Sequence, residues 1–131
     1  MKQPRQTGPD PDRSRRGAVS YQSGLAAEDA VGRHYTALGL PVVARRWRGQ
    51  GGEIDLICAN GNGFLFVEVK SGPSFERAID RFCARQLSRI SLAAQEFVSD
   101  RAAGLDTPMR VDLALVDGTG TVSVLENVSL H

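Results

Sequence analysis

Apolar residues recur with two different periods along this chain, and the change of period marks its structural elements. Residues 20–38 place apolar side chains every three or four positions, which predicts an amphipathic helix that ends at Gly39. Residues 75–102 return to that period and predict one long helix, with Ser74 as its cap. Short runs rich in β-branched, aliphatic and aromatic residues predict five strands, at 41–44, 53–58, 64–70, 109–116 and 121–128.

The second and third strand runs form the most informative stretch of the sequence. They are joined by Asn-Gly-Asn-Gly (residues 60–63), which is typical of a tight hairpin turn. A turn centred on its middle two residues places Asp55 opposite Glu68 and Glu53 opposite Lys70. Because opposed residues of an antiparallel pair point to the same side, we expect these four charged side chains to gather at one end of one sheet face.

The remainder of this hairpin is apolar on both faces, so we expect it to be central and covered on both sides. Strict alternation predicts one face of Ile57, Phe64 and Phe66, and an opposite face of Ile54, Leu56, Cys58, Leu65, Val67 and Val69. Two opposed carboxylates beside buried surface repel each other, so they require a cation, a proton or a basic neighbour. An exposed salt bridge between Glu53 and Lys70, with the other two acids solvated, is the alternative interpretation.

Basic residues cluster in two places. Arg45, Arg46 and Arg48 surround Trp47; they either bind phosphates while the indole stacks on a base, or stay solvated while the indole fills the edge of the core. Three glycines at 49, 51 and 52 then permit another backbone, a ligand or a nucleic acid strand to pass closely.

In the predicted long helix, three arginines spaced four residues apart form a basic ridge that either contacts nucleic acid or remains a solvated face. They are Arg81, Arg85 and Arg89. Gln86 lies on the inner stripe of the same helix and is expected to reach the charged end of the hairpin. In the first predicted helix, Glu28 is an acid on an otherwise apolar stripe, and it is either a boundary residue that reaches water or an inward-facing group.

Composition limits the possible classes of protein. The chain has 131 residues, 41% hydrophobic and 24% charged, which suits one globular domain over 21–131. Residues 1–20 contain three of the six prolines and five basic residues against two acidic ones, which predicts a disordered basic tail. Since the whole chain has a net charge of +1 and residues 1–20 carry +3, residues 21–131 carry −2, which excludes a broadly basic nucleic-acid-binding domain. Two cysteines without metal-ligand spacing and no apolar run of membrane length favour a reduced, cytoplasmic chain and no membrane partner.

The element order is helix, three strands, helix, two strands, an α/β protein in α+β order with a mixed sheet of about five strands and a helix on each side. An Asp on one strand, followed by Glu-x-Lys on the next, resembles the PD-(D/E)xK nuclease superfamily. The wider string resembles the YraN-like proteins, also called uncharacterised protein family 0102. The matching segments are Gly24–Glu28 with Ala30, Gly52–Ile57 and Phe66–Lys70.

This resemblance implies a restriction-endonuclease-like fold and a nuclease site at Glu28, Asp55, Glu68 and Lys70. It implies that the three acids hold Mg²⁺ or Mn²⁺ and that Lys70 acts on the attacking water. Glu53 and Gln86 would contact these groups and hold them in position without binding the metal. The chain departs from the family at Arg85, where a lysine is expected, and at Ser71-Gly72, where an arginine usually follows the Glu-x-Lys motif.

The sequence therefore predicts a metal-dependent endonuclease-like protein that acts on nucleic acid, DNA rather than RNA, through the two arginine clusters named above. Two other classes remain open. One is a non-catalytic nucleic-acid-binding module on a nuclease fold, and the other is a structural or protein-interaction domain. A monomer and a homodimer are both compatible with the sequence.

Overall fold

The computed structural model describes the backbone of residues 11–128 and the side chains of residues 24–128. The elements are α1 (Pro11–Ala37), β1 (Val42–Arg48), β2 (Glu53–Asn60), β3 (Gly63–Ser71), α2 (Phe75–Ile79), α3 (Ala84–Ser99), a 3₁₀ turn (Gly104–Asp106), β4 (Met109–Val116) and β5 (Val122–Leu125). The helix α1 begins inside the segment 1–20 that was predicted to be a tail, and residues 1–10 of that segment lie outside the described residues. Within the described residues, we find no helix with the length and apolar character that crossing a bilayer requires.

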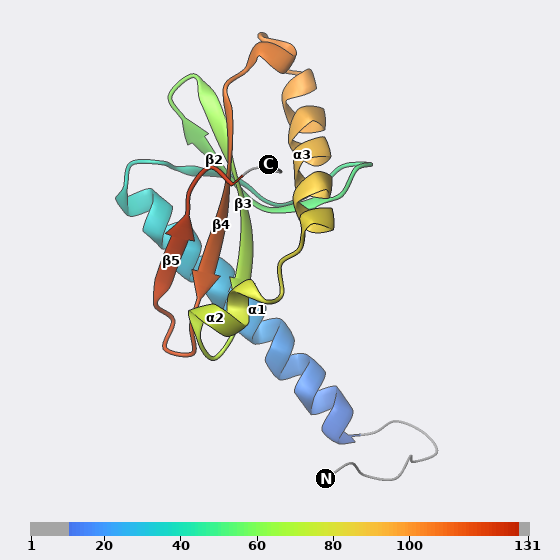
Figure 1. Ribbon diagram of the computed structural model, residues 1–131, viewed down its shortest axis with the longest axis vertical. Coiled ribbons are helices and arrows are strands. Elements are labelled where there is room, and N and C mark those ends of the chain that lie inside the picture. Colours follow the sequence, from blue (N-terminus) through green and yellow to red (C-terminus); the bar gives the residue numbers. More distant parts are fainter. Residues whose placement is uncertain (1–10, 129–131) are drawn as a thin grey trace.

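The five strands form one mixed sheet in the order β1-β2-β3-β4-β5, which confirms the predicted fold class (Figure 1). Neighbouring strands are antiparallel except for β3 and β4, which run parallel. A parallel pair needs a crossover connection, and α2 and α3 supply it between these two strands. The predicted element order thus produces an α/β fold in which the central hairpin lies inside the sheet.

The hairpin has the predicted register. Leu56 pairs with Val67, and Asn60 pairs with Gly63 across a two-residue loop. Gly61, the first residue of that loop, has φ +61°, a conformation that glycine adopts without a steric cost.

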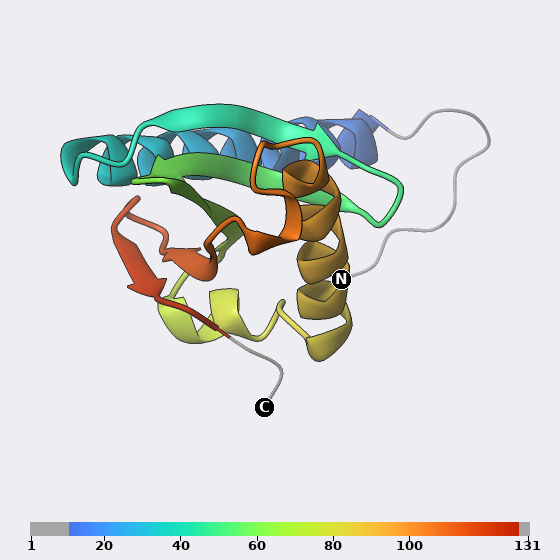
Figure 2. The same cartoon turned by 90° about the horizontal axis from the view of Figure 1, so that it is seen from above.

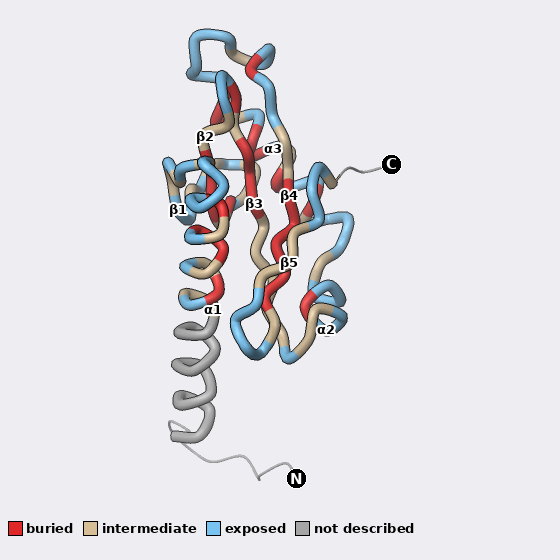
Figure 3. Tube along the Cα trace, turned by 90° about the vertical axis from the view of Figure 1, so that its left-hand side faces the viewer, coloured by how far each residue is buried: buried red, intermediate tan, exposed pale blue. Residues whose placement is uncertain are grey.

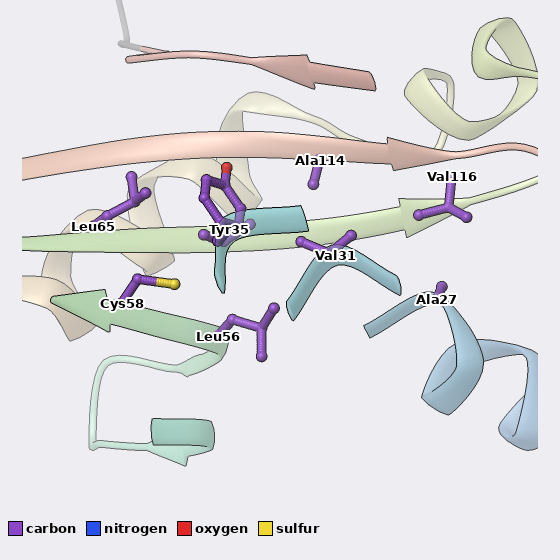
Figure 4. Packing of buried hydrophobic residues seen from close by; sticks show 9 residues of the cluster. Ala27, Val31, Tyr35, Leu56, Cys58, Leu65, Ala114 and Val116 are labelled. Carbon is purple, nitrogen blue, oxygen red and sulfur yellow. The ribbon is translucent and has the colours of Figure 1, made fainter. Parts of the chain in front are cut away.

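One face of the sheet packs against α1. Ala27, Val31 and Tyr35 lie on one side of this helix at four-residue spacing, and they contact apolar residues of β2, β3 and β4 (Figure 4). The sheet residues in this cluster are Leu56, Cys58, Leu65, Val67, Ala114 and Val116. Seen from above, α1 lies along one side of the sheet, with α2 and α3 on the other (Figure 2).

The opposite face packs against α3 and α2. Residues Ile90, Ala93, Ala94, Phe97 and Val98 of α3 cover Ile57 and Phe66, while Ala78 of α2 covers Leu113 and Leu115. Burial is concentrated in the middle strands, and the connecting loops are exposed (Figure 3). The central hairpin is therefore covered on both sides, as its apolar faces predicted.

The predicted single helix over 75–102 is wrong, because the chain divides it into α2 and α3. Cys83 is extended, with φ −140° and ψ 165°, and it is the N-terminal cap of α3. Phe82 packs against the apolar clusters beneath both helices, and the side chain of Gln86 accepts a hydrogen bond from the Cys83 N–H at 3.0 Å. Burial of the Phe82 ring and the cap of α3 compensate for the helical hydrogen bonds that are lost at the break. Arg81 consequently lies outside α3, and Ile79 and Cys83 are exposed.

Strict alternation on β2 is also wrong at one position. Ile54 packs with Ile57 on the α3 side, although alternation assigned it to the opposite face with Leu56. The neighbouring strand shows the same change, because Ala44 and Trp47 both contact the α3-side cluster. Arg46, which lies between them, has φ +49°. The left-handed backbone at this position reverses the alternation of β1, and β2 follows its partner.

A buried polar network joins α1, β4 and the segment after β5. Asp112 is fully buried and accepts hydrogen bonds from the Tyr35 hydroxyl at 2.7 Å, from two nitrogens of Arg110 at 3.0 Å each, and from the Asn127 N–H at 2.9 Å. Burial and this carboxylate raise the pKa of Tyr35, so that its hydroxyl remains a donor. A buried charge with four donors is stabilised where an unpaired one would be costly.

We expect Asp112→Asn to lower the free energy of unfolding by about 2 kcal/mol, because the substitution leaves the partly buried Arg110 without its counter-charge. Urea unfolding followed by circular dichroism measures this change. Asp106→Asn removes an exposed acid and is the control, with an expected change within about 0.5 kcal/mol. Equal stabilities of the two variants would contradict a structural role of the network.

Candidate functional site

The acids of the central hairpin meet where β2 and β3 separate. Their paired residues end at Leu56 and Val67, and β3 continues alongside β4 as far as Ser71. Just beyond the last pair, Oδ2 of Asp55 accepts the backbone N–H of Val69 at 2.8 Å. A carboxylate of β2 thus accepts a backbone N–H of β3 beyond the point where the residue pairing of the two strands stops. This bond fixes Asp55 beside Glu68, as the hairpin register predicted.

Glu68 is the most strongly perturbed acid at this position. Its side chain is 13% exposed. Burial raises its pKa to about 9, with further contributions from a hydrogen bond to Asp55 and from the charge of that carboxylate, against smaller opposing effects of Lys70 and the Val69 N–H. Near neutral pH, Glu68 therefore retains its proton.

Lys70 completes the group on the same face. Its ammonium lies 3.9 Å from Oε2 of Glu68, and its side chain is 19% exposed. The charge of Lys70 also contributes to lowering the pKa of the Cys83 thiol, after the larger effect of the Gln86 N–H. This places Lys70 near the start of α3. Two carboxyl groups and one ammonium thus lie on the sheet face that α2 and α3 cover, near the turn between these helices.

Glu28 has a different environment. Both of its carboxylate oxygens accept hydrogen bonds from Arg46, at 3.0 and 3.3 Å. Arg46 occupies the β1 position opposite Asp55, between the pairs Arg45–Leu56 and Trp47–Ile54. Among the side chains of residues 24–128, no group of three or more His, Cys, Asp or Glu residues could hold a metal. The structure therefore brings Asp55 and Glu68 together and holds Glu28 through an arginine on the adjoining strand.

The two residues expected to support the site have other partners. Glu53 accepts a hydrogen bond from Arg48, its cross-strand neighbour, at 2.9 Å. Gln86 uses its side-chain oxygen to cap α3. Neither forms a hydrogen bond or salt bridge with Lys70 among the described residues, and Gln86 instead fixes the start of the helix that lies beside this lysine.

The arginines of β1 are paired with acids of the same chain. Arg45 lies 3.5 Å from Asp29, and Arg46 and Arg48 bind the two glutamates described above. Trp47 packs edge-on against Phe97, with ring centroids 5.5 Å apart, on the α3-side cluster. Of the two interpretations of this segment, the structure supports an indole that fills the edge of the core.

The arginines beside α3 are exposed. Arg81, Arg85 and Arg89 form no side-chain hydrogen bond or salt bridge with any residue of the described part. A Cβ added at Gly52 would lie 3.3 Å from the Cβ of Arg89, so this arginine lies next to the segment that leads into Glu53 and Asp55. Arg85 lies near Cys83, whose thiol also senses Lys70. Arg89 therefore lies beside the segment that leads into the acid pair, and Arg85 lies one turn earlier on the same helix.

The glycines before β2 allow close contact with α3. A side chain at Gly49 or Gly51 would collide with Glu96, whose carboxylate accepts the N–H groups of Gln50 at 2.9 Å and Gly51 at 2.6 Å. This role of Glu96 was not predicted from the sequence. The structural role of Asp112 was also missed, and its place in an apolar alternating strand is the signal that could have indicated it.

The acid pair has the chemistry of a site for a hard divalent cation. Mg²⁺ commonly binds through one or two carboxylates, retains several waters and gains further oxygens from a substrate phosphate. Asp55 and Glu68 supply two such carboxylates, and burial and the neighbouring Asp55 raise the pKa of Glu68, which a bound cation would lower. These residues fit Mg²⁺ or Mn²⁺ and offer no nitrogen or sulfur ligand for softer metals.

Comparison with known proteins gives one consistent result. The model of uncharacterised protein family UPF0102 matches residues 27–116, a range that contains Glu28, Asp55, Glu68 and Lys70. A UPF0102 protein of Ruegeria pomeroyi is 47% identical over 116 residues, which cover 88% of this chain and 94% of that protein. A UPF0102 protein of Cereibacter sphaeroides is 49% identical over 111 residues, 85% of this chain and 95% of that protein. One from Dinoroseobacter shibae is 48% identical over 120 residues, 90% of this chain and 88% of that protein.

We expect Glu68→Gln to stabilise the metal-free protein at pH 8 by about 1 kcal/mol or more, the equivalent of one pKa unit. In the unfolded chain Glu68 loses its proton above about pH 4.5, whereas in the folded chain it keeps the proton up to about pH 9. The free energy of unfolding therefore falls as pH rises between these two values. Glutamine keeps a donor toward Asp55 and does not ionise. Thermal unfolding between pH 4 and pH 9, with a chelator present, measures the effect.

The gain should disappear at pH 4, where Glu68 is protonated in both states. The control is Glu53→Gln, which breaks an exposed pair with Arg48 and should change stability by less than about 1 kcal/mol at either pH. Destabilisation of Glu68→Gln at pH 8 would show that Glu68 is a structural ion-pair partner of Lys70 instead.

Proposed function

The chain belongs to uncharacterised protein family UPF0102, and we propose that it is a metal-dependent nuclease that hydrolyses phosphodiester bonds in nucleic acid, DNA in preference to RNA. One observation carries the proposal. Asp55 and Glu68 lie side by side at the margin of the core, the pKa of Glu68 is raised to about 9, and Lys70 lies within 4 Å of Glu68. A purely structural site gains little from two acids that repel each other, whereas a cation site needs them.

The acid pair and Lys70 would have separate roles in phosphodiester hydrolysis. Asp55 and Glu68 would hold Mg²⁺ or Mn²⁺, and the hydrogen bond from the Val69 N–H keeps Asp55 in position. A divalent metal bound there would neutralise phosphate charge and lower the pKa of water. Lys70, within 4 Å of Glu68, would orient the attacking water and offset the charge that develops on the phosphate.

Glu28 takes an indirect part in this proposal. Arg46 binds both oxygens of Glu28 and stands across the strand pair from Asp55. Glu28 would hold Arg46 in its left-handed backbone conformation, and Arg46 would in turn shape the end of β2 that presents Asp55. Glu28 would become a metal ligand only if this pair opened.

The substrate would approach along the α3 side. Arg85 and Arg89 are exposed and near the acid pair, whereas the three arginines of β1 are already neutralised by acids of the same chain. Contacts from a few arginines to phosphates give binding that weakens with salt and depends little on sequence. DNA is the substrate class that the likeness to PD-(D/E)xK nucleases implies.

A nucleic-acid-binding module without turnover is the second candidate, and the same exposed arginines favour it. It differs in one respect, because binding by arginines alone needs neither a metal nor Asp55. A dependence of metal affinity and cleavage on the acid pair therefore separates the two functions.

We expect wild-type protein to bind Mn²⁺ and Mg²⁺ in calorimetry, and Asp55→Asn to weaken that binding at least tenfold, because one of two carboxylate ligands is lost. Affinity should increase between pH 6 and pH 9, because the metal must displace the proton that Glu68 retains up to about pH 9. In Mn²⁺ or Mg²⁺, a fluorescently labelled oligonucleotide should be cleaved by wild type, and at least about 100-fold more slowly by Asp55→Asn or Lys70→Ala.

Asp106→Asn, an exposed acid of the 3₁₀ turn, is the matched control for charge removal and should keep wild-type affinity and rate. Single-stranded, duplex, flapped and RNA substrates would be compared in parallel. Metal binding without cleavage of any of them would favour the binding module. Absence of metal binding even with an oligonucleotide present would reject the nuclease mechanism.

A further inference from the structure

A second concave feature begins one residue beyond Lys70, at the carboxyl ends of the parallel strands β3 and β4. It is a pocket of about 580 Å³, within the range of about 300–1,000 Å³ that is usual for small-ligand sites. Residues of α1, the two strand ends and the turns around α2 line it, among them Ala26, Ala27, Ser71, Pro73, Arg81 and Val116. The carboxyl ends of parallel strands are where α/β proteins commonly bind ligands.

The pocket combines an apolar wall with one unneutralised cation. Ala27 and Val116 belong to the cluster packed against α1, and Pro73 adds a further apolar surface. Arg81 is exposed and forms no side-chain hydrogen bond or salt bridge within the described part of the chain. Its planar guanidinium suits a phosphate, while the apolar wall suits a flat ring.

A carboxylate also lines the pocket and narrows the class of ligand. Oδ1 of Asp117 accepts the N–H groups of Thr119 at 2.9 Å and Thr121 at 3.0 Å, and the Thr119 hydroxyl at 2.7 Å. The Thr119 hydroxyl, followed by the two N–H groups, holds the pKa of Asp117 below its usual value, so the group stays ionised. Its other oxygen has no hydrogen-bond partner among the described residues. A ligand with donors as well as a phosphate fits this pocket better than a bare anion does.

We propose that the pocket binds a nucleoside monophosphate unit, with the phosphate on Arg81, the base against the apolar wall, and a hydroxyl or amino group on Asp117. Ser71 directly follows Lys70 but faces the α1 side of β3, as Val69 does, so a strand leaving the pocket would pass around the end of β3 to reach the acid pair on the opposite face. Resting on the proposed nuclease function, the occupant is the terminal nucleotide of a strand whose following phosphodiester reaches Asp55, Glu68 and Lys70. The protein would thus act near phosphorylated strand ends.

The test measures binding in a chelator, where no cleavage occurs. Fluorescence anisotropy compares one short oligonucleotide with a 5′-phosphate, a 3′-phosphate or hydroxyls at both ends, and calorimetry tests dAMP and inorganic phosphate. Wild type should bind one of the two phosphorylated forms at least fivefold more tightly than the hydroxyl form. Arg81→Ala should remove this preference, and so should Ala26→Glu, which places a negative charge at an exposed lining position of α1.

Two substitutions are matched controls outside the pocket. Arg77→Ala removes another exposed arginine, and Ala37→Glu repeats the alanine change at the exposed end of α1; both should keep the preference. Melting temperatures establish that all four variants are folded. dAMP should bind more weakly than the preferred oligonucleotide and should compete with it.

Equal affinity of wild type for phosphorylated and hydroxyl-ended oligonucleotides would overturn the proposed nucleotide site. An equal loss of affinity for both oligonucleotides in Arg81→Ala would also overturn it, and would make Arg81 an ordinary contact to the nucleic acid backbone. Binding of dAMP or of inorganic phosphate as tightly as the phosphorylated oligonucleotide would overturn the strand-end occupant. These outcomes leave metal binding and cleavage untouched, so failure of the pocket and failure of the nuclease site are distinguishable.

Discussion

The separation of β2 from β3 beyond Leu56 and Val67 is the constraint on which the charged end of this molecule depends. Where two strands part, backbone donors and acceptors lose their partners, and each must be satisfied in another way. Here the carboxylate of Asp55 takes the N–H of Val69, and so the backbone itself fixes one acid beside another. The raised pKa of Glu68 is a consequence of its burial and of the neighbouring Asp55.

The surroundings support this arrangement from both sides of the sheet. On one side, α3 is fixed by its cap at Cys83 and by Glu96, which binds the loop before β2. On the other side, Arg46 and Glu28 connect β1 to α1 opposite Asp55. The carboxyl groups therefore lie on rigid elements, which is what precise positioning of a cation or a phosphate requires.

Charge is distributed unevenly between the two arginine clusters, and the structure explains why. Those on β1 face acids of α1 and β2, and they serve the fold. Those near α3 are exposed, and Arg89 lies next to the segment that leads into Glu53 and Asp55. A nearly neutral protein can thus present positive charge where a polyanion would bind, without a basic surface elsewhere.

The sequence by itself determined the strands, the hairpin register and the meeting of Asp55 with Glu68, because alternation and turn chemistry act between residues close together in the chain. It also indicated membership of the family, through the motifs of this hairpin. Tertiary structure decided the rest. Phe82 divided the expected long helix because its ring packs beneath both halves, and Arg46 with its left-handed backbone moved Ile54 to the other face. The partners of Glu28, Glu53 and Gln86, and the pocket beside Lys70, depend on which elements pack together, and local periodicity carries no information about contacts between distant segments.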